Sequence, residues 1–294
     1  MELRAGQTAV VTGAASGIGL AMVRRFAAEG LNVVLADVEE GALRKAAEEL
    51  RESGAVVLAQ VVDVSARDAV EALAEAAYET FGAVHVLCNN AGVGSGAEGR
   101  MWQHDPHDWQ WAFAVNVWGV FHGIQAFVPR MLATQEPGHV VNTSSGDGGI
   151  APLPTASVYA VTKAAVVTMT ESLYAHLTAE GAGIGASVLF PGPHMLRTGL
   201  WESHRNRPQR YAKSRPRKTP YRSLDQWETA MREAGHQVRF TPVEEVAELV
   251  MDGIRSDRFW MLPASERSDA QIRARAQSML DRANPAYLES FILD

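Results

Sequence analysis

The sequence predicts an α/β protein with a doubly wound parallel sheet of about seven strands in a three-layer α/β/α arrangement. Short apolar, β-branched runs alternate along the chain with amphipathic segments in which Ala and Leu recur at helical spacing. Strands that alternate with helices form a parallel sheet covered on both faces, and such sheets bind ligands at the carboxyl ends of their strands. The predicted strands are 8–12, 32–37, 56–62, 84–89, 139–143, 184–190 and 259–262.

Helix boundaries follow the same order. Gly30 and Gly54 stand after the first two amphipathic segments, at positions where helices commonly end on glycine. Ser65 is expected to cap the third helix, with Asp68 in its first turn. The helices expected from these boundaries are 20–29, 39–53 and 66–81.

Composition bounds the class of protein. The chain has 294 residues, of which 47% are hydrophobic and 21% are charged, as is typical of a globular protein. A three-layer sheet accommodates this length, so a single domain, residues 1–294, is expected. A formal net charge of -7 argues against nucleic acid or an anionic membrane as the partner, because phosphate binding needs an excess of basic residues.

The single cysteine, Cys88, excludes an internal disulfide and a cysteine-based metal site. A reduced, cytoplasmic setting is therefore expected. The N-terminal residues pass directly into strand-like sequence, and the apolar runs are far shorter than the roughly 20 residues of a transmembrane helix. The sequence predicts neither a signal peptide nor a membrane span.

A glycine-rich turn follows the first strand. It contains Gly13, Gly17 and Gly19, and it runs directly into a helix. Such glycines permit a tight turn, let a pyrophosphate approach backbone N–H groups at the helix N-terminus, and bring the helix close to the sheet. The strand before the turn and the helix after it supply the context that this Rossmann-type motif requires.

Two carboxylates stand after the next two strands. Asp37 lies about 20 residues beyond the glycine turn, where a carboxylate accepts hydrogen bonds from the adenosine ribose and repels a 2′-phosphate. No arginine follows it directly, so NAD is favoured over NADP; a helix cap is the alternative role. Asp63 is expected to hold the adenine amine, with local capping as the alternative.

Tyr159 and Lys163 stand four positions apart at the start of an apolar helical segment, so both side chains project from one face. A tyrosine with an ordinary pKa of about 10 is a poor base at neutral pH, and a nearby ammonium lowers that pKa. Polar motifs at predicted strand and helix ends accompany the pair. They are Asn-Asn-Ala-Gly at 89–92, Asn-Val-Trp-Gly at 116–119, Asn-Thr-Ser-Ser at 142–145 and Pro-Gly at 191–192.

With these motifs in order, the sequence resembles the short-chain dehydrogenase/reductase family, in its compact NAD-dependent branch. The resemblance implies that Tyr159 transfers the proton and that Lys163 lowers its pKa and holds the nicotinamide ribose. It also implies that Ser145, with Ser144 as the alternative, hydrogen-bonds the substrate oxygen. Asn116 is implied to order a water relay. The implied cofactor-binding residues are Gly13, Ser16, Gly17, Ile18, Gly19, Asp37, Asp63, Val64, Asn90, Gly92, Tyr159, Lys163, Pro191, Gly192 and Thr198.

One position departs from the family pattern. The family places a threonine that contacts the nicotinamide carboxamide five residues after Pro191, but Leu196 stands there and the nearest threonine is Thr198. A short insertion accounts for the shift. It leaves His194 facing either the substrate or solvent.

Two regions extend beyond the smallest family members: a substrate-binding lid insertion at 194–240 and a C-terminal helical extension at 264–294. The lid contains a basic run, interpreted as a solvated flexible segment whose arginines face outward. Contact with an anionic substrate or an acidic partner protein is the alternative. The basic residues are Arg205, Arg207, Arg210, Lys213, Arg215, Arg217, Lys218 and Arg222.

These features predict an oxidoreductase that transfers hydride between NAD(H) and a bulky, largely apolar secondary alcohol or ketone. A lid this long is unnecessary for a small alcohol, because ordering each loop residue costs on the order of 1–2 kcal/mol. The residues expected to line the substrate pocket are Trp102, His194, Leu196, Leu200 and Trp201. For Trp201, packing into the lid's own core is the alternative.

The alternatives are a ketoacyl carrier-protein reductase, whose basic lid would dock an acidic carrier, and a non-catalytic NAD-sensing protein. Asp37 counts against the first, because the reductive members of that group generally use NADPH, and the full catalytic set counts against the second. A metal site at His104 and His107 is not expected, since no third spaced ligand is evident. The family resemblance also implies a homodimer or homotetramer.

Overall fold

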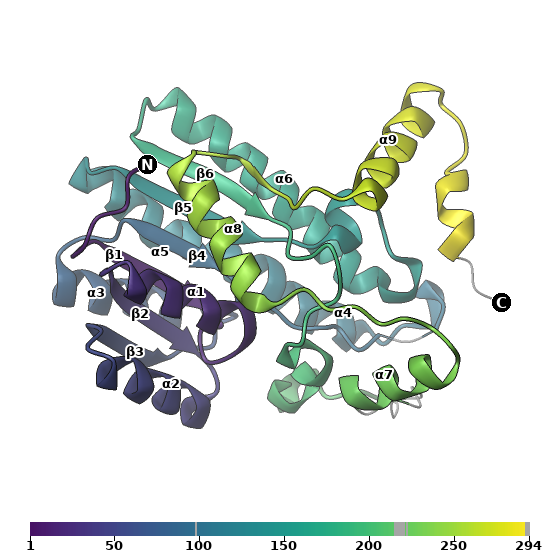
Figure 1. Cartoon of the computed structure of the whole chain (residues 1–294), viewed down its shortest axis with the longest axis horizontal. Helices are drawn as coiled ribbons and strands as arrows, with labels where there is room; N and C mark the ends of the chain where they lie inside the picture. The colour runs from purple at the N-terminus through teal and green to yellow at the C-terminus, as the bar shows by residue number, and fades with distance from the viewer. Residues whose placement is uncertain (98, 215–220, 222, 292–294) are drawn as a thin grey trace.

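The sheet of the computed structural model is parallel throughout, with seven strands among the described residues, 1–97, 99–214, 221 and 223–291 (Figure 1). The strand order is β3-β2-β1-β4-β5-β6-β7. Each predicted strand is present within two residues of its expected bounds, so the predicted sheet is confirmed. The strands are β1 (Thr8–Thr12), β2 (Asn32–Asp37), β3 (Val57–Val61), β4 (Val86–Asn89), β5 (Gly138–Thr143), β6 (Ile184–Leu189) and β7 (Trp260–Met261).

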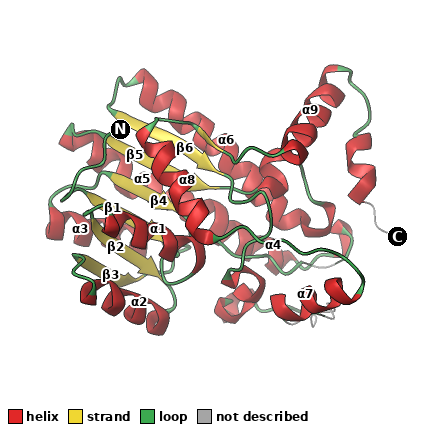
Figure 2. Ribbon diagram, viewed as in Figure 1, coloured by secondary structure: helices red, strands yellow, loops and turns green. Residues whose placement is uncertain are grey.

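Helices cover both faces of this sheet, which forms the middle of three layers (Figure 2). On one face α1 packs against α8 and α2, and on the other α3 packs against α5, with α6 against β6. The helices are α1 (Gly17–Ala28), α2 (Glu40–Glu52), α3 (Arg67–Phe81), α4 (Pro106–Phe113), α5 (Gly119–Thr134), α6 (Ser157–Ala179), α7 (Leu224–Glu233), α8 (Val243–Arg255) and α9 (Glu266–Leu280). Short helical turns between them are η1 (Met101–Gln103), η2 (Ala114–Trp118), η3 (Gly146–Ile150), η4 (Pro154–Ala156), η5 (Gly199–Asn206), η6 (Gln209–Tyr211) and η7 (Ala286–Phe291).

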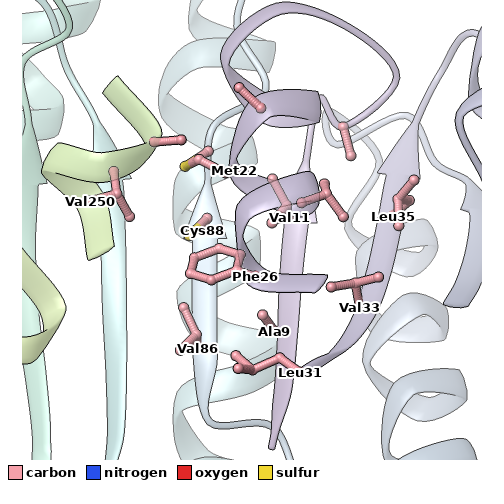
Figure 3. Close-up of a cluster of buried hydrophobic side chains, with 14 of the residues drawn as sticks. Ala9, Val11, Met22, Phe26, Leu31, Val33, Leu35, Val86, Cys88 and Val250 are labelled. Atoms are coloured by element: carbon pink, nitrogen blue, oxygen red, sulfur yellow. The ribbon is translucent and has the colours of Figure 1, made fainter. Parts of the chain in front are cut away.

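One core cluster fixes α1 on the sheet (Figure 3). Phe26 and Met22 of α1 are almost completely buried, in the same cluster as Val11 of β1, Cys88 of β4 and Val250 of α8. Burial of the Cys88 thiol raises its pKa, so this cysteine is an inert part of the core. Because the cluster holds α1 rigidly, the glycine-rich turn that precedes this helix is held rigidly as well.

The third helix begins one residue later than expected. Ala66, not Ser65, precedes the first helical residue, and no side chain caps this helix. The Ser65 amide and hydroxyl instead donate to Asp63 Oδ1, at 3.0 and 2.7 Å. The expected Ser65 cap is therefore wrong, because the Asp63 carboxylate closes the turn before the helix and engages the serine there.

The helices α4 and α5 and the turn η2 between them form one continuous helical stretch, residues 106–134, which is longer than the apolar runs seen in the sequence. Among the described residues it is the one helical stretch that passes a length and hydropathy test for a membrane span, with a mean hydropathy of 1.2. However, 61% of that window is buried inside the protein, and α5 packs against α3 and β4. The stretch is a core helix of the three-layer fold.

Two regions stand apart from the sheet layers (Figure 1). Residues between β6 and α8 form η5, η6 and α7, where the lid insertion was predicted. The C-terminal region contains α9 and η7, and α9 projects away from the sheet. Arg275 of α9 donates to the Ile150 carbonyl at 2.8 Å, which ties the extension to η3 directly after β5.

Candidate active site

A cavity of about 1180 Å³ opens at the carboxyl ends of the strands. This volume exceeds that of a typical pocket for a drug-sized ligand, and it is large enough for two ligands side by side. Predicted residues that line it are Gly13, Ser16, Gly17, Ile18, Asp37, Asp63, Val64, Asn90, Gly92, Ser145, Tyr159, Lys163, Pro191, His194, Leu196, Thr198, Leu200 and Trp201. The predicted residues outside the lining are Gly19, Trp102, Asn116 and Gly192.

The glycine-rich turn has the backbone that only glycine adopts easily. Gly13 and Gly17 have φ angles of +67° and +54°. A Cβ on Gly19 would lie 2.0 Å from the Gly13 carbonyl oxygen, so this glycine brings α1 against the turn and does not itself face the cavity. The turn leaves open backbone at the N-terminus of α1, a cradle that fits a pyrophosphate.

Carboxylates at the ends of β2 and β3 define the other side of this cradle. Asp37 accepts hydrogen bonds from the amides of Ala15 and Glu39, at 2.9 and 3.0 Å, so its carboxylate is fixed beside the glycine-rich turn. Asp63 is engaged with Ser65, which is the local alternative considered for it. Asp37 lines the cavity in a position that fits a ribose diol, and the adenine contact of Asp63 stays a prediction.

Asn90 joins the turn to the neighbouring strands. Its side-chain amide donates to the Thr12 carbonyl at 3.0 Å, and the Thr143 hydroxyl donates to its oxygen at 3.4 Å. A Cβ on Gly92 would lie 3.5 Å from both the Asn116 oxygen and Lys163 Nζ. The loop after β4 therefore passes directly beside the predicted catalytic side chains.

The first turns of α6 bring Tyr159 and Lys163 together. Lys163 Nζ lies 5.6 Å from the centre of the Tyr159 ring and donates to the Thr143 carbonyl at 2.8 Å. Burial lowers the pKa of Lys163 to about 8 and raises the pKa of Tyr159. Loss of solvation dominates the pKa of Tyr159, and the expected lowering of this pKa by Lys163 stays a prediction.

The two adjacent serines face different ways. Ser144 is buried and donates to the Lys163 carbonyl at 2.8 Å, so its hydroxyl holds α6 against β5. The Ser145 side chain lines the cavity and hydrogen-bonds Tyr159, which lowers the pKa of the tyrosine. Of the two serines, only Ser145 has its hydroxyl beside Tyr159. Ser145 is also the serine that the family resemblance favoured.

Asn116 lies in the wide turn η2, not in a regular helix, and it is completely buried. Its oxygen accepts from the Val93 amide at 2.8 Å, and its nitrogen donates to the Val93 carbonyl and the Thr162 hydroxyl, both at 3.0 Å. Wide turns of this kind are frequent at functional sites. With both ends of its amide engaged, Asn116 fixes the loop after β4 against α6.

Of the five predicted substrate residues, four line the cavity and Trp102 does not. The four are His194, Leu196, Leu200 and Trp201. Trp201 packs against Trp227 of α7 with tilted rings whose centres are 5.4 Å apart, and both residues line the cavity. Thr198 lies over the glycine-rich turn, where a Cβ on Gly17 would meet its methyl group at 3.0 Å. Trp102 is 78% exposed and lies outside the cavity, so its expected place in the pocket is wrong. The turn that contains it directs the ring toward solvent, where Arg100 packs over it.

The basic run of the lid is not a solvated segment over its described part. The Arg207 side chain is 9% exposed and pairs with Asp108 of α4 at 2.6 Å; Lys213 pairs with the same carboxylate at 3.3 Å. Arg205 pairs with Glu39, and Arg210 with Asp63 at 3.4 Å. The expectation of a solvated run is wrong for Arg207 and Lys213, which are largely buried beside Asp108, whereas Arg205 and Arg210 are exposed and also pair with acidic side chains. The remaining basic positions, Arg215, Arg217, Lys218 and Arg222, lie outside the described residues.

The two acidic residues near the histidine pair also have structural partners. Asp105 caps α4 and accepts from the Ser214 amide and hydroxyl, both at 2.7 Å, and these hydrogen bonds lower the pKa of Asp105 to about 2. Asp108 holds Arg207 and Lys213. Both carboxylates therefore attach the lid to α4.

Sequence reasoning missed several residues of the cavity wall. Asp147 lies two positions after Ser145, and its charge raises the pKa of Tyr159. Arg239, from the segment before α8, and Arg267, from the first turn of α9, line the same cavity. The position of Asp147 after the serine pair was a signal that sequence reasoning could have used. Nothing in the local sequence of Arg239 or Arg267 distinguishes them from surface arginines.

A doubly wound parallel sheet, a glycine-rich turn at an open helix N-terminus and a Tyr/Lys pair on one cavity define the class of nicotinamide-dependent oxidoreductases. The family model for short chain dehydrogenases matches residues 7–208. The chain belongs to this family.

Individual relatives cover nearly the whole chain. The 1-deoxy-11-beta-hydroxypentalenate dehydrogenase of Streptomyces exfoliatus is 37% identical over 92% of this chain and 86% of its own length. The C alpha-dehydrogenase of a Sphingobium species is 32% identical over 95% and 87%. A short chain dehydrogenase/reductase from Burkholderia phymatum, solved in complex with NAD, is 38% identical, with a TM-score of 0.86 over 97% of this chain and 98% of its own. The chain is thus a dehydrogenase of hydroxyl or keto substrates.

Proposed function

We propose that this protein is an NAD(H)-dependent dehydrogenase that interconverts a bulky, largely apolar secondary alcohol and its ketone. The observation that supports the proposal most is the continuity of the cavity. One wall includes the glycine-rich turn and Asp37, the pair Tyr159 and Ser145, and the aromatic pair Trp201 and Trp227 of the lid region.

Each proposed catalytic residue has a distinct role. The nicotinamide, when bound, accepts or donates the hydride. Tyr159 takes the hydroxyl proton in oxidation and returns it in reduction, and Ser145 holds the substrate oxygen by a hydrogen bond. Lys163 is a cation below its pKa of about 8, so it favours the phenolate and donates to the nicotinamide ribose. Asn116 positions the loop after β4, and its part in a water relay stays a prediction.

The proposal of NAD over NADP rests on Asp37. Its carboxylate is held at the end of β2 by two backbone amides, and a fixed negative charge repels a 2′-phosphate. Arg205 of the lid also lines the cavity, but its guanidinium is paired with the Glu39 carboxylate and donates to the Gly199 carbonyl. The complex of the Burkholderia phymatum relative with NAD supports the same choice.

The ion pairs of the lid weigh against a ketoacyl carrier-protein reductase. Within the described part of the basic run, Arg205, Arg207, Arg210 and Lys213 are paired within the chain, and these pairs make the four side chains less available to an acidic carrier. The expected homo-oligomer and cytoplasmic location remain predictions.

A comparison of two alcohols tests the proposed function. NADH formation is measured with 2-propanol and with 1-phenylethanol or a substituted cyclohexanol. Burial of several extra CH₂-sized groups at about 0.8 kcal/mol each predicts well over tenfold higher kcat/KM for the ring-bearing alcohols. Equal efficiencies would refute a bulky apolar pocket, and absence of NAD reduction by any secondary alcohol would refute the reaction.

A further inference from the structure

Three arginines line the cavity, and they differ in their partners. Arg205 is neutralised by Glu39 and also donates to the Gly199 carbonyl. Arg239 and Arg267 form neither a hydrogen bond nor an ion pair with any residue that the structure describes. In an acidic protein with a formal net charge of -7, two cations that line one cavity without a carboxylate partner are available to a ligand.

Both free arginines belong to segments that are fixed next to the catalytic residues. Arg239 lies two positions before Thr241, whose amide donates to the Met195 carbonyl at 2.8 Å and whose hydroxyl accepts from the His194 amide at 3.1 Å. The segment of Arg239 therefore runs beside the lid residues that follow β6.

Arg267 lies in the first turn of α9. This helix packs on η3, the turn that directly follows Ser145, and the Arg275 bond to Ile150 holds it there. The charge of Arg267 is close enough to Asp147 to lower the pKa of that carboxyl, although burial dominates and raises it. No ion pair joins Asp147 to Arg267 within the described part of the chain, so the guanidinium remains available.

The cavity that contains the catalytic residues and these arginines also has many apolar side chains in its wall. Tyr159 is half-buried and Lys163 is buried, whereas both arginines are exposed. A ligand that contacts both the catalytic residues and the arginines therefore combines an apolar body with a polar end near solvent. The apolar side chains of the wall include Ile150, Leu153, Met195, Trp201, Trp227 and Met231.

We propose that Arg267 and Arg239 bind a carboxylate at the end of the substrate remote from the carbinol carbon. The inference rests on the proposed function, because it assigns the substrate class of the same site. A guanidinium group binds a carboxylate through two parallel hydrogen bonds, so two arginines from different segments fix the long axis of the substrate. The substrate class is then a hydroxy- or keto-carboxylate with a bulky apolar body.

A binding experiment tests this inference independently of turnover. The probes are 4-acetylbenzoate and its methyl ester, which share the ring and the ketone and differ in charge at the remote end. Binding to the protein with NAD present is followed by quenching of tryptophan fluorescence, since Trp201 and Trp227 line the cavity. Two partly exposed charge-assisted hydrogen bonds predict about tenfold tighter binding of the carboxylate, and this preference declines with added salt.

Substitutions then locate the effect. Arg267→Gln and Arg239→Gln are each expected to reduce the ratio of carboxylate to ester affinity by about threefold, and the double variant abolishes the preference. Arg273→Gln is the matched control, because Arg273 lies on the same helix, is 79% exposed and does not line the cavity. It should leave the ratio unchanged. Equal or weaker binding of the carboxylate by the wild type, or an unchanged ratio in the double variant, overturns the inference.

The corresponding alcohols separate this inference from the proposed function. NADH formation is measured with 4-(1-hydroxyethyl)benzoate and its methyl ester. Oxidation of both with equal kcat/KM overturns the carboxylate site but leaves the dehydrogenase activity in place. Preferential binding of the ketone carboxylate without oxidation of either alcohol supports the anion site and contradicts the proposed reaction.

Discussion

The cofactor end of the cavity and its substrate end are built in different ways. The cofactor end consists of short turns that follow directly from strands: the glycine-rich turn after β1, Asp37 at the end of β2 and the Asn90 loop after β4. Their hydrogen bonds join side chains to nearby backbone atoms: the Ala15 amide donates to the Asp37 carboxylate, and the Asn90 side-chain amide donates to the Thr12 carbonyl.

The substrate end is assembled from segments that are distant in the sequence. The lid is attached to α4 by the pairs of Asp108 with Arg207 and Lys213, and to the cofactor end by Glu39 with Arg205. The extension α9 is attached through Arg275. If the proposed function holds, the cofactor site is encoded mainly in local turns, whereas the proposed substrate site depends on long-range side-chain contacts.

The largest effect should come from the catalytic centre, which both ends share. Tyr159→Phe removes the proton-transfer group and is expected to lower kcat by about 10²–10⁴-fold for every substrate. NAD binding, measured by titration, should be nearly unchanged, whereas Lys163→Ala should lose both activity and binding. Retention of more than about a tenth of wild-type kcat in Tyr159→Phe would show that another group transfers the proton.

The second-largest effect should come from detaching the lid, and it should change alcohol binding much more than NAD binding. Asp108→Asn leaves Arg207 and Lys213 without their carboxylate, and removal of one member of a buried pair costs about 3–5 kcal/mol. We expect KM for a bulky alcohol to rise at least tenfold and the lid to become sensitive to proteases, with a much smaller change in NAD affinity. Asp269→Asn, an exposed carboxylate 4.0 Å from Arg273, is the control. Equal losses of NAD affinity and alcohol affinity would contradict the claim that the lid contacts affect only the substrate end.

A substitution at the cofactor end should change the choice of cofactor and leave the KM for the alcohol unchanged. Asp37→Ala removes the negative charge that faces a 2′-phosphate, so the ratio of kcat/KM for NAD to that for NADP should fall by about tenfold. KM for the alcohol should not change. A wild-type protein that prefers NADP would contradict the role assigned to Asp37.

The smallest effect concerns Asp147. Its charge raises the pKa of Tyr159, so Asp147→Asn should lower that pKa. Because oxidation needs the deprotonated tyrosine, the acid limb of the profile of kcat/KM against pH should move to lower pH, by less than about one unit. A shift to higher pH would show that Asp147 acts through another group.

The sequence by itself determined the sheet, its strand bounds to within two residues and the glycine-rich turn. These features depend on periodicity and on residues a few positions apart, so neighbouring side chains and backbone geometry decide them. The same reasoning misplaced the third helix start by one residue, since the competition of Asp63 for Ser65 depends on side-chain geometry that spacing does not specify.

Only the tertiary structure decided how the lid is held and which residues line the substrate end. Trp102 was expected in the pocket and is exposed, whereas Arg267 was not considered and lines it. The basic run was interpreted as solvated because its acidic partners are distant in sequence: Arg207 and Asp108 are 99 positions apart. A pattern of local residues cannot specify such a pair, because the contact exists only after α4 and the lid have been brought together by the fold of the whole chain.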